Sequence, residues 1–428
     1  MKKKITIGML GLGTVGGGTL AILQKNKAEL QRKLGVDLEV KRIAVRDVKK
    51  PRSVAVDPVL LTDNQDAVLL DPEIDIVVEV MGGTEAARSA IKKALENGKY
   101  VVTANKDLMA QHGPELLAVA EACGKNIYYE ASVGGGIPLI RPLKYCLGAN
   151  RIKKVMGIIN GTTNYILTQM SREGKEFDEA LAEAQARGFA EADPTNDISG
   201  RDAAYKLNIL ASLAFSTVVQ MEDIFLEGID NVKLRDIRYA RELGYAVKLL
   251  AVGEETEAGL VLRVHPALIP LDHPLAAVEN EFNAIFLEGD AVGEVMFYGR
   301  GAGAMPTGSA VCADIMDAAR AIKNEQQNGV LETTFTRKKV VPMQDQHSRF
   351  YLRLKAEDEP GVFAKLAHAF GAARVSLDMI IQKRSDAKTA EIVLVTHDVS
   401  EGAFAKALAS LREMPAIRII NSILRVIE

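Results

Sequence analysis

Asp202 and Lys206 are the two side chains of this sequence whose spacing best suits proton transfer. They are four residues apart, so a helix places them on one face, and apolar residues at 209, 210 and 213 continue that stripe. A lysine near a helix N-terminus and beside apolar groups gives up its proton more readily, because the helix dipole and desolvation both disfavour the cation. Lys206 is therefore a candidate acid and base near neutral pH.

The same residues also suit a purely structural arrangement. Ser199 is a favourable N-cap, and Asp202 three residues later completes a capping-box pattern. An ordinary Asp–Lys pair on a helix has the same spacing. Both interpretations stay open at this point, and the elements that would position the pair must be considered.

A glycine-rich loop follows the first apolar run of the chain. Residues 4–10 are β-branched and apolar, and GLGTVG follows at 11–16 before a helical pattern. Between a strand and a helix, these glycines let the backbone approach a pyrophosphate at the helix N-terminus. A glycine-rich structural turn is the alternative. The positions expected to contact a dinucleotide are Gly11, Leu12, Gly13, Thr14, Val15 and Gly16.

The next predicted strand, 38–45, ends at Arg46 and Asp47, where such folds recognise the adenosine ribose. An acidic residue there suits NAD, and a basic one suits the 2′-phosphate of NADP. More basic residues follow within 49–52. We favour NADP, with Arg46 at its phosphate, and NAD stays open. The basic cluster could equally be a solvated loop.

Two further apolar runs, 74–81 and 100–103, alternate with helical patterns, which is typical of a doubly wound parallel sheet. Ligands bind beyond the carboxyl ends of such strands. Thr84 follows the first run in a loop that could cover the cofactor, and Lys106 follows the second. Lys106 is thus either a ligand-binding residue or a surface lysine. A last strand of this domain is expected over 126–131.

The run EASVGGGIP, which includes Glu130, leaves the first domain. A carboxylate with several glycine-freed carbonyls suits a weakly bound hard cation, although a hinge would have the same composition. Farther on, an apolar strand from 153 ends in GTTN at 161–164. The hydroxyl of Thr162 and free N–H groups at this helix start could receive a substrate carboxylate, or a threonine could simply cap the helix.

The rest of the chain is predicted from its periodicity. In the second domain we expect a helix within 243–252, a strand over 260–269, two short strands within 282–297, and a helix over 310–322 that packs back on the first domain. The C-terminal part predicts a β-α-β-β-α-β, ferredoxin-like fold, which fixes no function by itself. Its strands are expected over 350–356, 375–383, 389–396 and 417–426, with helices ending at 372 and covering 401–413.

The predicted fold class is α/β with three domains. The expected divisions are a Rossmann-type dinucleotide-binding domain over 1–130 with about 300–322 packing on it, an α+β substrate and dimerisation domain over 131–323, a linker over 324–348, and a ferredoxin-like domain over 349–428. The open sheet and the small C-terminal module favour a homodimer or homotetramer.

Composition narrows the class of protein. The 53 basic and 56 acidic residues nearly balance, so no basic surface points to nucleic acid. No apolar run is long enough to span a bilayer, and the start, MKKKITIGML, runs into a glycine loop without a cleavage site. The three cysteines are far apart without metal-ligand spacing, which indicates reduced thiols. We therefore expect a cytoplasmic protein that binds neither nucleic acid nor a membrane.

As a whole, the chain resembles the homoserine dehydrogenases, in the bacterial form with a C-terminal ACT domain. The most specific motifs are NGTTNYIL and GFAEADPTNDISGRDAAYK, supported by GLGTVG, VVTANK and EASVGGGIP. The resemblance implies interconversion of L-homoserine and L-aspartate 4-semialdehyde with NAD(P), on the route to threonine, methionine and isoleucine. Aspartate-semialdehyde dehydrogenase would need a nucleophilic cysteine in an activating motif, which is not evident. A non-catalytic amino-acid sensor is the other alternative, and an intact set of site residues argues against it.

The resemblance also assigns roles to the charged residues. Lys206 matches the proton donor and acceptor, and Lys106 matches a lysine that contacts both cofactor and substrate. Glu191 matches the carboxylate that binds the substrate ammonium. Asp197 and Asp202 fall on acidic positions near the substrate. Thr162 and Gly188 are the remaining positions expected to bind substrate, and Phe189 stands where some members have tyrosine.

Two further sites come from the resemblance. Glu130, with the carbonyls of Val133, Gly135 and Ile137, matches a sodium site, so we expect Na⁺ or a similar monovalent cation. Gly303 resembles the glycine that closes over the cofactor from the far side. The segment DEPGVFAKLAHAF implies amino-acid binding by the ACT domain, with L-threonine as the expected effector.

Overall fold

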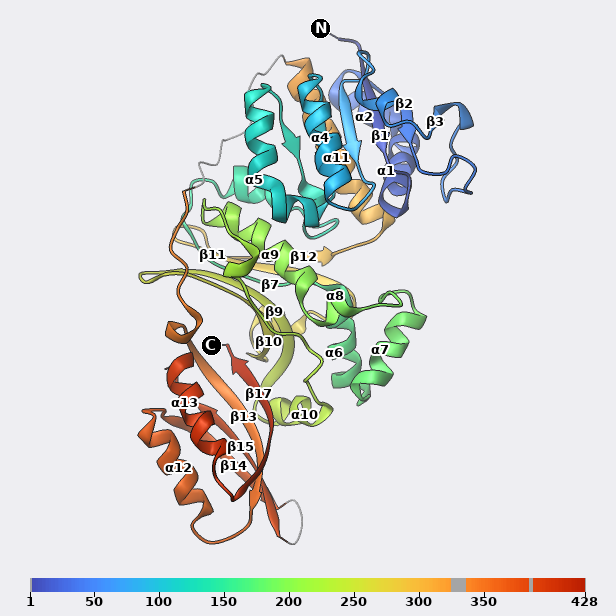
Figure 1. Cartoon of the computed structure of the whole chain (residues 1–428). Helices are drawn as coiled ribbons and strands as arrows, with labels where there is room; N and C mark the ends of the chain where they lie inside the picture. The colour runs from blue at the N-terminus through green and yellow to red at the C-terminus, as the bar shows by residue number, and fades with distance from the viewer. Residues whose placement is uncertain (1, 325–335, 385–387, 428) are drawn as a thin grey trace. The chain divides into compact units, whose positions relative to one another are not determined.

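A computed structural model describes residues 2–324, 336–384 and 388–427 of the chain (Figure 1). The chain divides into two compact units, and each is described by itself. The first unit contains 1–155, 205–222 and 283–337; the second contains 156–204, 223–282 and 338–428. Within the described residues, no helix is both long and apolar enough to cross a membrane.

The first unit is built on a six-stranded sheet in the order β3-β2-β1-β4-β5-β6. All its strand pairs are parallel, and β1, β4 and β5 are almost completely buried, as a sheet covered on both faces requires. This confirms the predicted Rossmann-type fold. The strands are β1 (Lys4–Leu10), β2 (Asp37–Ala44), β3 (Leu61–Thr62), β4 (Ile76–Glu79), β5 (Tyr100–Thr103) and β6 (Ile127–Tyr128).

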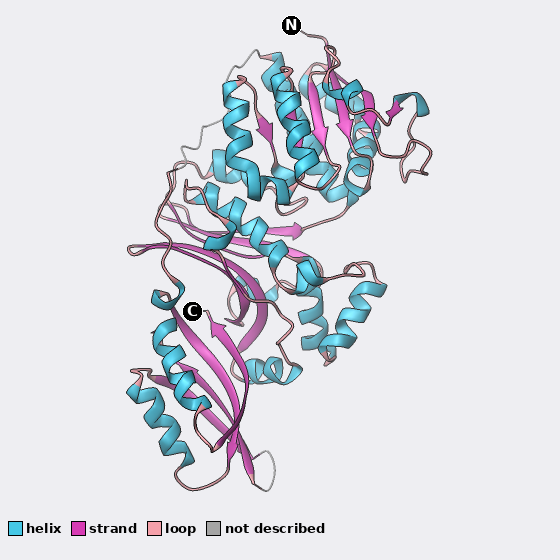
Figure 2. Ribbon diagram, in the orientation of Figure 1, coloured by secondary structure: helices cyan, strands magenta, loops and turns pink. Residues whose placement is uncertain are grey.

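Helices flank this sheet (Figure 2). The predicted packing of a late helix on the first domain is confirmed, although α11 begins at Ala304 rather than at 310. It lies so close to α1 that a Cβ at Gly18 would be 2.0 Å from the Ala304 carbonyl oxygen. The helices are α1 (Thr14–Lys25), α2 (Lys27–Leu34), α3 (Asp66–Leu69), α4 (Glu85–Glu96), α5 (Lys106–Ala122) and α11 (Ala304–Lys323).

Several elements connect the two units along the chain. β7 (Ile152–Ile158) and α9 (Arg201–Ala214) each begin in one unit and end in the other. The two short strands predicted within 282–297 are confirmed as β11 (Phe282–Gly289) and β12 (Gly293–Arg300), and the strand order there is β12-β11-β7.

The second unit carries a long antiparallel hairpin of β9 (Tyr245–Thr256) and β10 (Gly259–Pro270). The predicted helix within 243–252 is therefore wrong. A short apolar run fits a buried strand as well as a buried helix, and Gly244, with φ of +85°, ends the preceding helix. The remaining elements are β8 (Phe225–Leu226), α6 (Gly161–Glu173), α7 (Phe177–Ala186), α8 (Thr195–Ile198) and α10 (Leu234–Glu242).

The C-terminal part has the predicted ferredoxin-like topology, with strand order β17-β13-β15-β14. Figure 2 shows both of its helices on one face of this sheet, where Phe350, Leu366 and Phe404 belong to one buried apolar cluster. The elements are β13 (His347–Glu357), α12 (Val362–Ala372), β14 (Leu377–Arg384), β15 (Thr389–Thr396), β16 (Val399–Ser400), α13 (Glu401–Arg412) and β17 (Ile417–Val426).

The predicted linker, 324–348, is described in part, because 325–335 lie outside the described residues. The remainder has structure of its own. Val340 bridges to Leu260, Met343–Asp345 form a 3-10 turn, and β13 already begins at His347.

Candidate functional site

The helices α1 and α11 of the first unit each begin directly after a glycine, which has no side chain to cap them. Gly13 precedes α1 and Gly303 precedes α11, and neither provides a side-chain hydrogen bond to the free N–H groups. Because the start of α11 packs against Gly18 of α1, both ends lie in one region. Free N–H groups of this kind favour an anion such as a pyrophosphate.

The loop before α1 needs its glycines. Gly11 has a φ of +102°, and a Cβ there would lie 2.6 Å from the Val80 carbonyl oxygen. A Cβ at Gly16 would lie 2.7 Å from the Gly11 carbonyl oxygen. The loop from 11 to 16 can therefore be this tight only with glycine at these positions.

The basic residues after β2 have two different environments. Arg52 donates to the Leu12 carbonyl at 3.4 Å and also to the Asp47 carbonyl, so it fastens the glycine loop. Arg46 is exposed and makes no hydrogen bond or ion pair within the described part of the chain. Its guanidinium is available for a phosphate.

Side chains at and just after the carboxyl ends of β4 and β5 form a connected group. Glu79 is fully buried; it accepts from the Thr103 hydroxyl at 2.7 Å and from Met81 N–H at 2.9 Å, and burial raises the pKa of its carboxyl. Asn105 donates to the Gly83 carbonyl at 2.7 Å and caps α5, whose first residue is the half-buried Lys106.

These contacts fix the loop that contains Thr84, which is the residue before α4 and does not cap it. Glu79 and Asn105 were not predicted as site residues. An asparagine directly before a helix, next to a candidate lysine, is the signal that could have identified Asn105.

In the second unit, the side chain of Asn160 binds two acidic residues of the candidate site. Its Nδ2 donates to Asp197 at 2.7 Å and to Asp202 at 2.8 Å, and its Oδ1 accepts from Thr163 N–H at 2.8 Å. Asn160 is thus the N-cap of α6, which corrects the expectation that Thr162 or Thr163 would cap this helix. An asparagine amide has both donor and acceptor atoms, so Asn160 can cap α6 and bind the two carboxylates at the same time.

Thr162 is linked to the turn at Gly188 by a hydrogen bond to the next residue, Phe189. The Thr162 hydroxyl donates to the Phe189 carbonyl at 2.7 Å, and Gly188 has a φ of +75° in the turn that precedes it. Glu191, farther along the same loop, is exposed. The free N–H groups at the start of α6 therefore face a loop that carries a carboxylate.

The proposed capping role of Ser199 is wrong. Ser199 follows α8 as its C-terminal cap, and Gly200, with φ of +81°, precedes α9. Asp202 and Lys206 do lie on one helix, one turn apart, as predicted from their spacing. Asp202 is 7% exposed and Lys206 is half-buried.

Glu130 is buried in the first unit, and its carboxylate already accepts three backbone hydrogen bonds. Its carboxylate accepts N–H groups from Leu139 at 2.5 Å, Ile140 at 2.9 Å and Arg141 at 2.8 Å. The strand predicted over 126–131 is shorter in the structure. β6 ends at Tyr128, because the chain turns into a 3-10 helix at Glu130. The carboxylate retains limited capacity for a cation.

The carbonyls predicted to join Glu130 fit a cation better. Among the described residues, the carbonyl oxygens of Val133, Gly135 and Ile137 accept no hydrogen bond, and all three residues are buried. No group of three or more His, Cys, Asp or Glu side chains with metal-ligand spacing exists in the described part of the chain. A cation here would depend mainly on carbonyl oxygens, which suits a weakly bound hard ion.

Comparison with known proteins decides the family. A model of homoserine dehydrogenase matches 138–316, a model of its NAD-binding domain matches 11–130, and an ACT-domain model matches 350–416. The homoserine dehydrogenase of Synechocystis is 47% identical over 99% of both chains, and that of Bacillus subtilis is 43% identical over 99% of this chain and 98% of its own.

The chain belongs to the homoserine dehydrogenase family. A crystal structure of a homoserine dehydrogenase from Thiobacillus denitrificans is 43% identical, with a TM-score of 0.95, and covers 100% of this chain and 99% of its own. A hyperthermophilic archaeal homoserine dehydrogenase mutant, solved in complex with NADPH, is 30% identical, has a TM-score of 0.62 and covers 74% of this chain and 97% of its own.

Membership in the homoserine dehydrogenase family fixes the general function. The protein is an oxidoreductase with homoserine dehydrogenase activity, a nicotinamide-dinucleotide-binding domain and a C-terminal ACT domain. The predicted fold class, with a Rossmann-type nucleotide-binding domain, a mixed-sheet domain and a C-terminal ACT domain, is confirmed. The roles of individual residues rest on the geometry described above.

Proposed function

We propose that this chain interconverts L-homoserine and L-aspartate 4-semialdehyde, with Lys206 as the proton donor and acceptor. The observation that carries the proposal is the Asn160 amide, which holds Asp197 and Asp202 at the start of the helix that bears Lys206. A bound nicotinamide cofactor supplies the hydride chemistry. The chain's own residues bind the substrate, orient it against the cofactor and move the proton.

The substrate is an amino acid, and the second unit offers groups for both of its charged ends. Glu191 and Asp197 supply carboxylates for the ammonium, and the free N–H groups at the start of α6, near Thr162, suit the carboxylate. Orienting reactants in this way is worth on the order of 7–11 kcal/mol in model reactions. Lys106 Nζ would hold substrate and cofactor together at the end of β5.

NADP is the proposed cofactor, with NAD as the alternative. The exposed guanidinium of Arg46 at the end of β2 suits the 2′-phosphate, while the loop 11–16, Thr84 and Gly303 suit the rest of the dinucleotide. The NADPH complex of the archaeal relative supports this assignment. Comparing turnover with each cofactor distinguishes the two.

The remaining assignments are also proposals. Na⁺ or a similar monovalent cation would bind Glu130 and the free carbonyls of Val133, Gly135 and Ile137. L-Threonine is the proposed effector of the ACT domain, the assembly is a homodimer or homotetramer, and the pathway leads to threonine, methionine and isoleucine in the cytoplasm. The division at 130, 323 and 348 is kept as the proposed domain organisation.

Lys206→Ala tests the central assignment. We expect kcat to fall ~10²–10⁴-fold, because general acid–base catalysis contributes that much. Cofactor binding, followed by nicotinamide fluorescence, should be unchanged. Arg201→Ala is the matched control, since Arg201 is exposed on the same helix. Normal turnover of Lys206→Ala would remove Lys206 from the mechanism.

A further inference from the structure

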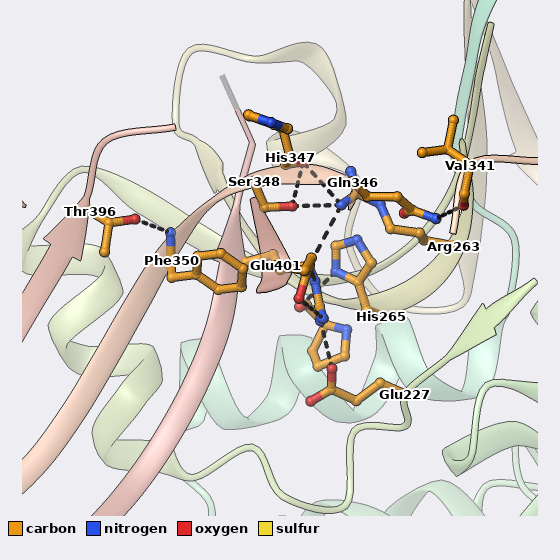
Figure 3. A network of polar contacts seen from close by, with 12 residues as sticks. Glu227, Arg263, His265, Val341, Gln346, His347, Ser348, Phe350, Thr396 and Glu401 are labelled. Carbon is orange, nitrogen blue, oxygen red and sulfur yellow. Dashed lines mark hydrogen bonds and ion pairs between the residues drawn. The ribbon is translucent and has the colours of Figure 1, made fainter. Parts of the chain in front are cut away.

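Glu79, at the carboxyl end of β4 in the first unit, is fully buried and makes no ion pair in the described part of the chain. By contrast Glu401, a largely buried carboxylate of the second unit, has Arg425 as its cation (Figure 3). Burial raises the pKa of Glu79, and the hydrogen bonds that its carboxyl accepts oppose that rise. A carboxyl group that is costly to bury and has no cation indicates a role besides stability.

The groups that hold this carboxyl form a closed ring of hydrogen bonds. Its two oxygens accept from the Met81 N–H at 2.9 Å and from the Thr103 hydroxyl at 2.7 Å. The Thr103 oxygen in turn accepts the Asn105 N–H at 3.1 Å, and the Asn105 amide donates to the Gly83 carbonyl at 2.7 Å. From Gly83 the backbone leads back to Met81 and Glu79. The ring therefore joins the loop after β4 to the start of α5.

The loop that the ring holds has an open outer face. Gly82 and Gly83 are exposed, with φ of +74° and +78°, and a Cβ at either position would meet no described atom within 4 Å. Glycine is therefore needed here for the backbone conformation and not for lack of space. The loop presents bare backbone outward, while its inner side is tied to Glu79 through the Met81 N–H.

The same loop lies against the glycine-rich turn after β1. A Cβ at Gly11 would lie 2.6 Å from the Val80 carbonyl oxygen and 2.9 Å from the Met81 Cα atom. In the strand order β3-β2-β1-β4-β5-β6, the direction of the connections reverses between β1 and β4. Dinucleotides bind across this point, with the adenosine half toward the end of β2. The loop after β4 is therefore on the side of the nicotinamide half.

The other end of the ring is the residue before Lys106. Asn105 is buried, and its Oδ1 atom accepts the Leu108 N–H at 3.1 Å, which caps α5. Lys106 is the first residue of that helix, so its backbone is fixed by the same amide that holds Gly83. A shift of the loop therefore also changes the position of the lysine. Misplacing a reacting group by about 1 Å can cost ~10²-fold in rate.

We propose that Glu79 is a positioning residue that acts through Thr103 and Asn105 to align the nicotinamide half of the cofactor with Lys106. Because Glu79 is fully buried, it acts through these groups and not by contact with the substrate. The inference deepens the proposed function and rests on it for the role of Lys106.

Binding of two probes to the full chain tests the proposal by calorimetry. NADPH contains both halves of the dinucleotide, whereas adenosine 2′,5′-bisphosphate contains only the adenosine half. Thr103→Val keeps the shape of the side chain but removes the hydroxyl that links Glu79 to Asn105. We expect it to weaken NADPH binding about tenfold, as for the loss of one hydrogen bond to a charged group, and to leave bisphosphate binding unchanged. The kcat should fall ~10²-fold.

Thr103→Ser keeps the hydroxyl and should bind both probes as the unchanged chain does. A role in packing alone would give the reverse order, because serine loses the methyl group that valine keeps. Glu79→Gln keeps the side-chain volume but replaces one acceptor by a donor, so it should show the same selective loss and carries the test if Thr103→Val does not fold. Glu96→Gln is its matched control, since Glu96 is exposed at the end of α4.

Three results would overturn the proposal. They are equal weakening of both probes, unchanged NADPH affinity in both Thr103→Val and Glu79→Gln, and a Thr103→Ser variant as impaired as Thr103→Val. Calorimetry requires no turnover, so these results are independent of whether Lys106 and Lys206 perform the reaction. If the unchanged chain binds NADH and not NADPH, the proposed cofactor is wrong, and NADH with AMP then provides the same comparison.

Discussion

At the scale of single residues, Asn160 holds the acidic part of the candidate site together. Asp197 and Asp202 would repel each other without the amide that donates to both. Sequence reasoning identified the two carboxylates and the lysine but not this amide, because a side chain that bridges segments 37 and 42 residues apart leaves no periodic signal.

Asn160→Ala should therefore lower kcat/KM by about 10–100-fold, as expected for losing hydrogen bonds to charged groups. It also removes the N-cap of α6, which costs ~1 kcal/mol of stability. Steady-state kinetics and thermal unfolding measure the two effects. Asn196→Ala, an exposed position on α8, is the control. A variant with lower stability but normal kcat/KM would limit Asn160 to capping.

Lys248 gives the second unit a specific pH dependence. It is buried, its ammonium donates to the Val278 carbonyl and to Asn164 at 3.3 Å, and desolvation lowers its pKa to about 8 from the ordinary 10.5. Between these two values the unfolded chain binds more protons than the folded one, so the stability of the fold rises with pH in that window.

We expect the free energy of unfolding to increase by about 2 kcal/mol from pH 7 to pH 9.5 through this group, and Lys248→Met to remove that increase. Urea unfolding at both pH values measures the difference. Comparison with the exposed Lys153→Met separates the burial of Lys248 from the general loss of a positive charge. An equal pH response in both variants would contradict the assignment.

At the scale of elements, α10 is joined to the sheet of the ACT domain by a buried polar network. Arg353 donates to Asp236 at 2.6 and 3.1 Å and to Glu391 at 3.1 Å. The hydroxyls of Tyr351 and Tyr239 donate to these carboxylates at 3.0 and 2.5 Å. Every one of these side chains is buried, so each charge depends on its partners.

Arg353→Met should cost about 3–5 kcal/mol of stability, because it leaves Asp236 buried without its cation. The double variant Arg353→Met/Asp236→Leu should recover much of that loss, since both charges are then replaced by apolar groups. Urea unfolding of the two variants is the measurement. A double variant no more stable than Arg353→Met would show that packing, not the unpaired charge, dominates.

The elements that could be predicted are those with a clear period or a clear boundary. The strands over 100–103, 389–396 and 417–426 have the predicted bounds. β9 was mistaken for a helix because its buried part, 245–252, is apolar apart from Lys248 and shows no strict alternation, and Ser199 was mistaken for a cap because Gly200 separates it from α9. Both errors arise where tertiary contacts, rather than local preference, choose the conformation.

At the scale of the whole molecule, the ACT domain is built into the second unit rather than appended to it. β17 extends the sheet beyond β10 at Arg425 and Val426, Arg425 also holds Glu227, and Arg353 neutralises Asp236 of α10. A separate regulatory module would share few such contacts with its neighbour. This part of the assembly could not be predicted from the sequence, whose periodicity reveals only the internal pattern of the domain.

Deleting residues 347–428 should therefore destabilise what remains, in addition to any loss of regulation. The edge of β10 and the buried face of α10 would be exposed, and Asp236 would lose its cation. We expect a lower Tm and aggregation on gel filtration, with partial recovery in the truncated chain carrying Asp236→Asn. A truncated chain that is monodisperse and unfolds at the same temperature as the full chain would show instead that the network serves communication between the domains and contributes little to their stability.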